Sequence, residues 1–282
     1  MNAKCRSLVE SNISIEDVSK FRESDVLLVP ILNVDGIIVK ILDLRKQLSV
    51  IPASVLIMAG GKGERLRPLT DLVPKPMLRI GNKPIIEHNI DRLANFGITE
   101  HFISVKYLAN QIEEYFGDGS NKDISISYIH EEKPLGTLGA LALIDEINNE
   151  HLLVMNSDIL TNIDYEDLFK FYIESEADLC IVSIPYKVKV PYAVLETNEN
   201  NIVSFKEKPT YTYYSNGGIY FMKSELKNVI PYNSFYNATD LMEELIKQGK
   251  KVIHYPLLSY WLDIGRHEDF SRAQEDIKHI KI

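Results

Sequence analysis

The sequence predicts an α/β protein whose strands form a layered, mostly parallel sheet. Two observations support this fold class. Apolar runs of strand length, such as Val55 to Ala59 and His151 to Met155, alternate along the chain with segments whose apolar residues recur at helical spacing, such as Ile85 to Phe96. The first run also breaks directly into a glycine-rich turn, where the backbone can turn sharply and approach a ligand closely.

Composition narrows the class of protein. The 282 residues include 31 basic and 40 acidic side chains, for a formal charge of -9. This acidic balance argues against a general nucleic-acid binder. Cys5 and Cys180 are too few for a disulfide framework, and the first ten residues contain no apolar signal-peptide core. We therefore expect a cytoplasmic protein with no membrane and no nucleic-acid partner.

Residues 1–51 are predicted to form a small α/β unit, separate from a larger domain over residues 52–282. The expected elements are a helix from Ile15 to Glu23, strands from Val26 to Leu32 and from Gly36 to Leu42, and a short helix from Asp43 to Leu48. This order resembles the later part of a cystathionine-β-synthase (CBS) type motif. Such motifs work in pairs, so the resemblance implies either that the other half is missing from this chain or that a second subunit completes the module, which would make a homodimer through this unit.

A CBS unit can also sense adenylates. Asp43 and Lys46 stand where the Thr and Asp that contact a ribose are expected. A structural or dimerising role is therefore the favoured interpretation of this unit.

The stretch from Ser54 to Met77, SVLIMAGGKGERLRPLTDLVPKPM, carries the strongest functional signal. Peptide N–H groups at Gly60, Gly61 and Gly63 can form an anion cradle. Basic residues follow at several reaches: Lys62, Arg65, Arg67, Lys75, Arg79 and Lys83. The glycine spacing fits neither a P-loop nor a dinucleotide fingerprint. A solvated basic turn would not explain why Lys75 lies between two prolines, which restrict the backbone on both sides.

This stretch resembles the GGxGTRLxPLT and PKPM signature of sugar-1-phosphate nucleotidylyltransferases, with Glu64 in place of the usual Thr. The resemblance implies a three-layer α/β/α, Rossmann-like domain with a mixed, mostly parallel sheet. It also implies that a nucleoside triphosphate and a sugar 1-phosphate are the substrates. Among family members, CBS-linked guanylyltransferases of the mannose-1-phosphate or legionaminic-acid type are the most similar.

The next elements are a strand from His101 to Val105, a helix from Ala109 to Phe116 and a strand from Ile124 to Ile129. The segment from Glu131 to Gly139 then resembles the family's PLGTAGAL segment, which lies against the nucleotide base. Gly136 would let the backbone approach a flat ring, and Glu131 stands at the base-reading position. A carboxylate accepts two hydrogen bonds from the N1–H and N2–H₂ edge of guanine, which favours GTP, whereas an amide suits thymine or uracil better.

Asp158 directly follows the strand from His151 to Met155, at the edge of the sheet where ligands bind in open α/β folds. It matches the family's first metal-binding Asp. Asp164 precedes the helical run from Tyr165 to Glu174 and is assigned as an N-cap instead. Asp263, in Trp261-Leu262-Asp263-Ile264-Gly265, matches the second metal ligand.

Between these two carboxylates, after a strand from Leu179 to Ile184, the sequence resembles the family's sugar-binding segments. Tyr192-Ala193-Val194 stands where Tyr-Gly-Val is usual, and the Ala193 methyl leaves the sugar's identity open. Glu207-Lys208-Pro209 matches an EKP motif, whose Glu holds sugar hydroxyls and whose Lys meets the sugar phosphate. Asn216 lies on the strand that floors the pocket. Helices from Thr239 to Gln248 and from Glu268 to Ile282 complete the predicted fold.

The resemblance implies attack by a sugar 1-phosphate oxygen on the α-phosphorus of a triphosphate, which requires no covalent nucleophile. Charge neutralisation is then the main catalytic task. The catalytic residues implied are Arg65 and Lys75, and Mg²⁺ is the cofactor, bound by Asp158 and Asp263. The nucleotide-binding residues are Ala59, Gly60, Gly61, Gly63, Arg65, Glu131 and Gly136, and the sugar-phosphate-binding residues are Tyr192, Glu207, Lys208 and Asn216. A thymidylyltransferase and an inactive, nucleotide-binding regulator are the alternatives.

Overall fold

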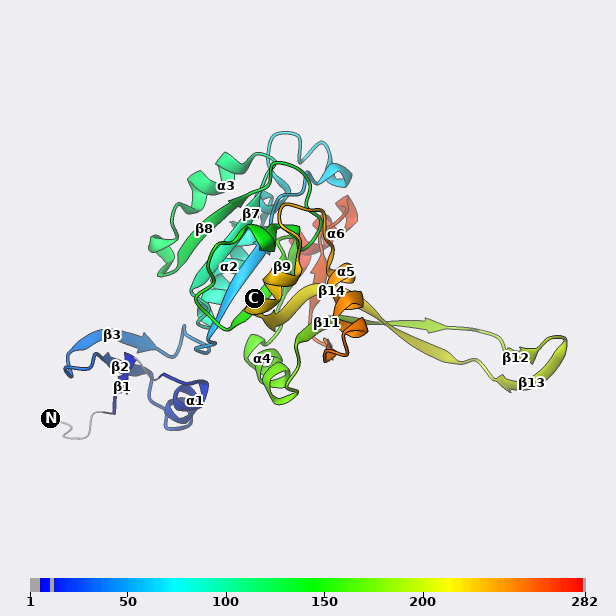
Figure 1. The fold of residues 1–282 in the computed structure, drawn as a ribbon, viewed down its shortest axis with the longest axis horizontal. Helices are drawn as coiled ribbons and strands as arrows, with labels where there is room; N and C mark the ends of the chain where they lie inside the picture. Colours follow the sequence, from blue (N-terminus) through cyan, green and yellow to red (C-terminus); the bar gives the residue numbers. More distant parts are fainter. Residues whose placement is uncertain (1–5, 11–12, 281–282) are drawn as a thin grey trace.

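The computed structural model describes residues 6–10 and 13–280 (Figure 1). The α-helices are α1 (Ile15–Glu23), α2 (Ile85–Asn95), α3 (Ala109–Phe116), α4 (Tyr165–Glu174), α5 (Ala238–Lys247) and α6 (His267–Asp276). Short 3₁₀ turns include η2 (Glu64–Leu66), η3 (Lys75–Met77), η5 (Gly139–Leu143) and η6 (Ser224–Val229). None of the described helices is long and apolar enough to cross a membrane.

A seven-stranded sheet forms the centre of the larger domain, in the order β15-β11-β14-β9-β4-β7-β8. Its strands are β4 (Ala53–Met58), β7 (Glu100–Val105), β8 (Ser125–His130), β9 (His151–Asn156), β11 (Leu179–Lys189), β14 (Thr210–Lys223) and β15 (Val252–Pro256). Only β14 runs antiparallel to its neighbours β9 and β11. The predicted mixed, mostly parallel sheet is therefore confirmed.

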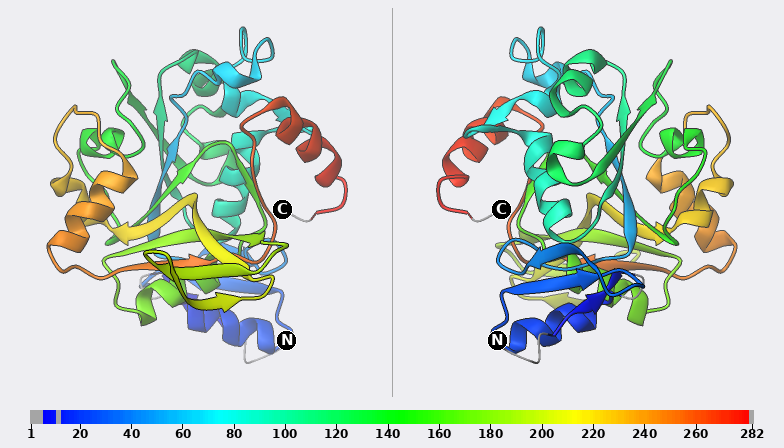
Figure 2. Two further views of the ribbon diagram at one scale, coloured as in Figure 1. Left: turned by 90° about the vertical axis from the view of Figure 1, so that its right-hand side faces the viewer. Right: turned by 90° about the vertical axis from the view of Figure 1, so that its left-hand side faces the viewer.

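Helices and turns cover both faces of this sheet. Alternate residues of β4 point to opposite sides, so Val55 and Ile57 enter one core while Leu56 enters the other. The first core contains the apolar faces of α2, α3 and α4, and the second contains those of η5, η6 and α5. Figure 2, which views the molecule from two opposite sides, shows this layered arrangement. A third small cluster, around Leu66 and Ile264, joins α6 to the segment after the glycine loop.

The N-terminal unit has its own sheet of β1 (Leu8–Val9), β2 (Leu28–Leu32) and β3 (Ile38–Asp43), packed against α1. The predicted helix from Asp43 to Leu48 is wrong. Asp43 ends β3, and its carboxylate accepts a hydrogen bond from the backbone N–H of Arg45 (3.1 Å) and pairs with the Arg45 guanidinium (2.7 Å). This local side-chain bonding stabilises a turn in place of a helix.

The unit joins the larger domain through the end of α2. Ile51 N–H donates to the Phe96 carbonyl (2.9 Å), and Gly97, at φ 85°, leaves room for the chain at Val50. A Cβ at Gly97 would lie 2.6 Å from Val50 Cα, so this contact requires glycine. Val50 packs against the small core of the N-terminal unit, and the next residue, Ile51, belongs to the first core of the larger domain.

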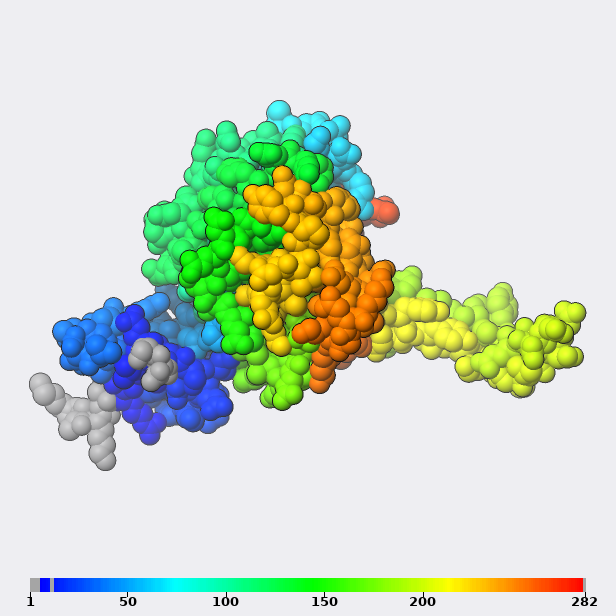
Figure 3. Space-filling model, viewed as in Figure 1, coloured from blue at the N-terminus to red at the C-terminus, as the bar shows by residue number. Residues whose placement is uncertain are grey.

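The largest departure from prediction is a β-arm, residues 184–215, that leaves the sheet. β11 was predicted to end at Ile184 but runs to Lys189, paired with β14 from Thr210 to Ser215. A hairpin of β12 (Val194–Asn198) and β13 (Asn201–Lys206) continues the arm. Figures 1 and 3 show the β-arm projecting from the body. At about 3.3 Å per residue, the fifteen steps from Ile184 to Glu199 span roughly 50 Å.

The remaining short strands are β5 (Arg79–Ile80), β6 (Lys83–Pro84), β10 (Ile159–Thr161) and β16 (Trp261–Asp263). The helix predicted to reach Ile282 is shorter, since α6 ends at Asp276 and residues 281 and 282 lie outside the described range. Asp164 is the N-cap of α4, as predicted, because its side chain accepts from the N–H groups of Glu166 (2.9 Å) and Asp167 (3.0 Å).

Candidate active site

A cavity of about 760 Å³ lies at the carboxyl ends of β4, β7, β8 and β9. Its wall consists of the glycine loop, the start of the Pro134–Thr137 segment, and the turn after β9. The lining residues are Met58, Gly60, Gly61, Lys62, Gly63, Glu64, Arg65, Lys75, Pro76, Ser104, Lys106, Glu131, Pro134, Leu135, Gly136, Thr137, Asn156, Ser157, Asp158, Phe235 and Gly265. Most of the predicted nucleotide-binding residues therefore share one cavity.

The glycine loop is closely packed at Gly63 and open at Gly61. Gly63, at φ 64°, packs so closely on the Lys75 stem that a Cβ there would lie 2.9 Å from Lys75 Cβ. The Thr70 hydroxyl donates to the Gly63 carbonyl (2.9 Å). At Gly61, by contrast, a Cβ would meet no atom within 4 Å. The backbone at Gly61 is thus accessible to an anion, as a phosphate cradle requires.

Ala59, directly after β4, supports this loop and does not line the cavity. Its side chain is buried, and its N–H donates to the Ser104 carbonyl (2.9 Å). The predicted role of Ala59 in nucleotide binding is therefore limited to positioning the glycines that follow it.

Four cationic side chains line the cavity: Lys62, Arg65, Lys75 and Lys106. Lys75 belongs to η3, where the flanking prolines fix its backbone, and its ammonium group pairs with the Asp158 carboxylate. The Arg65 guanidinium lies over Gly265, where a Cβ would approach Nη2 to 3.2 Å. Gly265 therefore gives Arg65 the space to lie beside the acidic end of the cavity.

That acidic end consists of two carboxylates from distant parts of the sequence. Asp158 follows β9, and Asp263 ends β16, which pairs with β10 so that Asp263 opposes Ile159. The Ile264 N–H donates to the Asp158 carbonyl (3.0 Å), which fixes the two chains side by side. Burial, with the nearby Asp158 charge as the second cause, raises the pKa of Asp263 to about 6.

These two carboxylates have the character of a cation site. The Oδ1 atoms of Asp158 and Asp263 are both buried, and neither has a hydrogen-bond partner in the described structure. Orphaned buried oxygens of this kind are unusual unless an ion or water completes them. No cluster of three or more His, Cys, Asp or Glu ligands occurs among residues 6–10 and 13–280. Two carboxylates suit Mg²⁺, which commonly binds one or two protein carboxylates together with substrate phosphates.

Glu131 lies at the opposite end of the cavity, after β8. Its Oε1 accepts from the Ser104 hydroxyl (2.8 Å) and its Oε2 from the Leu135 N–H (3.2 Å). A Cβ at Gly60 would lie 2.8 Å from Glu131 Oε1, so the carboxylate rests directly on the glycine loop. Each oxygen keeps acceptor capacity after these bonds, because a carboxylate has about four lone-pair sites.

Gly136 lines the cavity for a reason that the sequence did not reveal. At φ 75°, a Cβ there would lie 2.7 Å from the Tyr236 carbonyl oxygen. Glycine thus allows the Pro134–Thr137 segment to pack against the start of α5, where the Thr137 hydroxyl accepts from the Ala238 N–H (2.6 Å). This packing brings Phe235, from the same connection, to the rim of the cavity.

The structure does not bring the predicted sugar-phosphate residues to this cavity. Tyr192, Glu207 and Lys208 are exposed on the β-arm, and Tyr192 is 75% exposed. Asn216 lies at the base of the arm, where it donates to the Tyr220 hydroxyl (2.9 Å) and accepts from the Gly218 N–H (2.9 Å). None of these four residues lines the cavity.

Several cavity residues were missed by sequence reasoning. Ser104 and Lys106 flank the carboxyl end of β7, Asn156 ends β9, and Ser157 follows it. The rule that ligands bind at the carboxyl ends of strands identified Asp158, and the same rule applied to β7 would have identified Ser104 and Lys106. Phe235 carries no such signal, because only the packing of Gly136 places it here.

Comparisons with known proteins agree with this geometry. A model of the nucleotidyl transferase family matches residues 54–280. The chain belongs to this family. Curated relatives include mannose-1-phosphate guanyltransferase beta-A of Xenopus laevis, which is 32% identical over 223 residues, covering 76% of this chain and 62% of that protein. D-glycero-alpha-D-manno-heptose 1-phosphate guanylyltransferase of Aneurinibacillus thermoaerophilus is 32% identical, covering 79% of this chain and 98% of that protein.

Solved structures of this family share the fold. HddC from Yersinia pseudotuberculosis, crystallised with GMP-PN, aligns with a TM-score of 0.62 at 25% identity, covering 80% of this chain and all of that one. A putative glucose-1-phosphate thymidylyltransferase from Bacillus anthracis aligns with a TM-score of 0.66 at 23% identity, covering 82% of this chain and 97% of that chain. The chain spans about three fifths of the length of the mannose-1-phosphate relatives and nearly all of the heptose-1-phosphate relative.

Proposed function

We propose that this protein transfers GMP from GTP to a sugar 1-phosphate, giving a GDP-sugar and pyrophosphate. The observation that carries the proposal is the layout of the cavity. The glycine loop and its cations lie between a buried carboxylate pair, Asp158 and Asp263, and the base-reading candidate Glu131. If a nucleoside triphosphate lies along this cavity, its phosphates would contact backbone amides and cations. Its base would contact the acceptor oxygens of Glu131.

At the phosphate end, charge neutralisation would carry the reaction. A metal ion held by Asp158 and Asp263 would draw negative charge from the α-phosphate oxygens. The Gly61 backbone and Arg65 would hold the β- and γ-phosphates and stabilise the charge that develops on the leaving pyrophosphate. Lys75 pairs with Asp158 in the structure, and it would neutralise the incoming sugar phosphate once a metal ion competes for that carboxylate.

At the base end, residue 131 is a glutamate and not an amide, and this supports guanine as the base. The remaining acceptor sites of Glu131 suit the two adjacent donors of guanine, N1–H and N2–H₂. The names of the relatives agree with this, since those with mannose 1-phosphate and heptose 1-phosphate are guanylyltransferases. A thymidylyl- or uridylyltransferase is the second candidate, favoured by a uridylyltransferase of Synechocystis that is 31% identical over 252 residues.

The proposal is tested by release of pyrophosphate. Purified protein is incubated with Mg²⁺, each of GTP, dTTP, UTP, CTP and ATP, and a panel of mannose, heptose and glucose 1-phosphates. We expect turnover with GTP and one of these sugars. Lys75→Ala and Asp158→Asn should each lower turnover by about 10²-fold or more, as expected when an oriented charge contact is removed. Lys83→Ala, outside the cavity, is the matched control and should change turnover less than about threefold.

We also propose that the N-terminal unit contributes a homodimer contact. The face of its sheet opposite α1 exposes Ile38 (58%) and Ile41 (58%). An apolar sheet face of this kind is costly in water and commonly marks an interaction site. Ile38→Lys should shift the oligomer toward smaller species in sedimentation analysis, whereas Lys40→Ala on the same strand should not.

A further inference from the structure

Lys106 lines the cavity but has no role in the reaction proposed above. It directly follows β7, whose last residue, Val105, accepts a hydrogen bond from the Glu131 N–H (3.0 Å). Two residues before Lys106, the Ser104 hydroxyl donates to Glu131 Oε1 (2.8 Å). Alternate residues of an extended chain point to the same side. Ser104, Lys106 and Glu131 therefore line the cavity from one side.

Lys106 and Glu131 border the same glycine without pairing. A Cβ at Gly60 would lie 2.8 Å from Glu131 Oε1 and 3.5 Å from Lys106 Cβ. Among the residues that the structure describes, the Lys106 ammonium nevertheless has neither a hydrogen bond nor an ion pair, whereas the Lys75 ammonium pairs with Asp158. Glu131 also keeps unused acceptor sites, because a carboxylate has about four. A donor and an acceptor that are both available thus lie beside each other.

The strand order places Lys106 at the base end of the cavity. In the order β8-β7-β4-β9, the strand that Lys106 follows lies beside the strand that Glu131 follows, whereas Asp158 follows β9. Neighbouring strands are about 4.8 Å apart, so β7 is roughly 10 Å from β9. The glycine loop, which follows β4, lies between them. Phosphates held by that loop and by the carboxylate pair would therefore leave the base beside Lys106.

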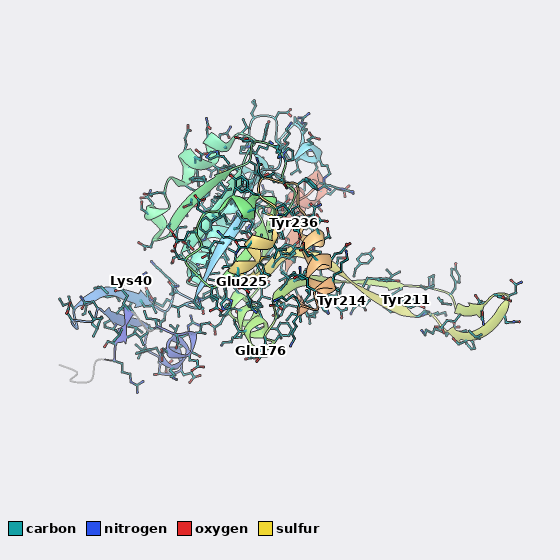
Figure 4. The ribbon with its side chains drawn as sticks, viewed as in Figure 1. Lys40, Glu176, Tyr211, Tyr214, Glu225 and Tyr236 are labelled. Carbon is teal, nitrogen blue, oxygen red and sulfur yellow. The ribbon has the colours of Figure 1, made fainter. Side chains whose placement is uncertain are left out.

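The chain on both sides of this end of the cavity is held in place. Directly after β7, the Tyr107 hydroxyl donates to the Asp71 carbonyl (2.9 Å). Across the cavity, the Tyr236 N–H donates to the Leu135 carbonyl (2.9 Å), within the Pro134–Thr137 segment. Figure 4 shows Tyr236 on the connection before α5. Recognition by hydrogen bonds requires such support, because donors and acceptors must hold their directions.

We propose that Lys106 and Glu131 together recognise guanine. The Lys106 ammonium donates to O6, while the Glu131 carboxylate accepts from N1–H and N2–H₂. The inference rests on the function proposed above and adds a second specificity-determining residue to it. Lysine and arginine are common partners of guanine O6 and N7 where proteins read nucleic acids.

The pair of side chains discriminates against each of the other bases. Adenine presents the N6 amino donor where guanine has O6, so it would place a donor against the Lys106 ammonium. Cytosine, thymine and uracil carry the acceptor O2 where guanine has its N2 amino group, so each would place an acceptor against the Glu131 carboxylate. One donor beside one carboxylate thus matches guanine alone among the five bases.

Binding of triphosphates that differ only in the base tests the contact without any transfer reaction. Calorimetric titration with Mg²⁺ present gives the Kd of GTP, of ATP and of 6-thio-GTP, in which sulfur replaces O6. Lys106→Met keeps the side-chain stem and removes the donor. It should weaken GTP binding by about 10- to 100-fold, as expected when a hydrogen bond from a charged group is lost, and change ATP binding less than about threefold. Lys106→Arg keeps a donor and should retain most of the preference for GTP.

Two controls separate a base contact from a phosphate contact. Lys62→Met, on the glycine loop, should weaken binding of all three nucleotides by a similar factor. Lys170→Met, exposed on α4 and outside the cavity, should change none of them. Equal losses for GTP and ATP in Lys106→Met would make Lys106 a phosphate ligand and overturn the proposal, and so would an unchanged Kd for GTP.

The wild-type protein alone provides a test that does not depend on the folding of a variant. It should bind GTP about 10-fold more tightly than 6-thio-GTP, because sulfur is the weaker acceptor. Equal affinity for these two nucleotides, or tighter binding of ATP or dTTP than of GTP, would overturn the recognition of guanine. Guanine-selective binding without transfer to any sugar 1-phosphate would instead refute the proposed function and leave the recognition of guanine intact.

Discussion

The sharpest prediction concerns Glu131→Gln. In the structure, the Glu131 carboxylate accepts one hydrogen bond from the Ser104 hydroxyl and one from the Leu135 N–H. Glutamine can keep both contacts, because its amide oxygen accepts from Leu135 and its amide nitrogen donates to the Ser104 oxygen. The loop should therefore keep its conformation, and the change alters only the hydrogen-bonding character presented to a base.

The magnitude follows from the bonds at stake. A hydrogen bond to a charged group contributes about 1.5–3 kcal/mol, and each 1.4 kcal/mol changes a rate or equilibrium constant tenfold. Replacing one carboxylate acceptor by a donor that faces N1–H or N2–H₂ should thus lower kcat/KM for GTP by about 10- to 100-fold. Inosine triphosphate lacks the N2 amino group, so the wild-type protein should prefer GTP over it, and this preference should shrink toward unity in Glu131→Gln.

The assay is steady-state pyrophosphate release with GTP, inosine triphosphate and dTTP, alongside thermal unfolding to verify the fold. Glu132→Gln is the matched control, because Glu132 is exposed and outside the cavity. If Glu131→Gln lowered kcat/KM for all three nucleotides by the same factor, Glu131 would only organise the loop. The base-reading assignment would then be withdrawn.

Three further predictions follow from buried titratable groups. Asp263→Asn should lower turnover in activity assays by about 10²-fold. The same change should raise the melting temperature, measured by calorimetry, by several degrees, because it removes a buried negative charge beside Asp158. Mg²⁺ affinity, measured by calorimetric titration, should weaken about tenfold per pH unit below about 6, since protons compete for Asp263, and Asp263→Asn should abolish this slope. Burial lowers the pKa of His101 to about 4, so the unfolded chain binds a proton that the folded chain excludes between pH 6.5 and 4. Stability should fall by about 3 kcal/mol over that window in denaturant titrations, and His101→Leu should remove this loss, whereas exposed His279→Gln should leave it unchanged.

Local sequence signals predicted several helices in both parts of the chain, because each of these helices is specified by nearby residues. The helix bounds Ile15–Glu23, Ala109–Phe116 and Tyr165–Glu174 were predicted as the structure has them. Apolar periodicity and caps decide such segments before any tertiary contact forms. The helix predicted from Asp43 to Leu48 is wrong for a reason that is also local. The Asp43–Arg45 interaction favours a turn, which the helical pattern did not reveal.

The site could be predicted only where a strand end or a glycine turn marked it. Asp158 and the loop from Gly60 to Gly63 carry such marks. The approach of Asp263 to Asp158 depends on the pairing of β10 with β16, about a hundred residues apart, which no local pattern encodes. The sugar-phosphate motif shows the opposite case. Its residues can be recognised in the sequence, but their distance from the cavity depends on the direction in which the β-arm leaves the sheet after Ile184.

The cavity and the β-arm lie at the same edge of the central sheet, because β11 runs parallel to β9 and β4 through the strands between them. At that edge, the buried Oδ1 atoms of Asp158 and Asp263 lack hydrogen-bond partners in the described structure, and the side chain of Tyr186 is 64% exposed. A metal ion and substrate phosphates would complete the two carboxylates, because buried polar atoms are rarely left without partners. The sequence marks this edge at Asp158 and the glycine loop, whereas the pairing of distant strands decides what else reaches it.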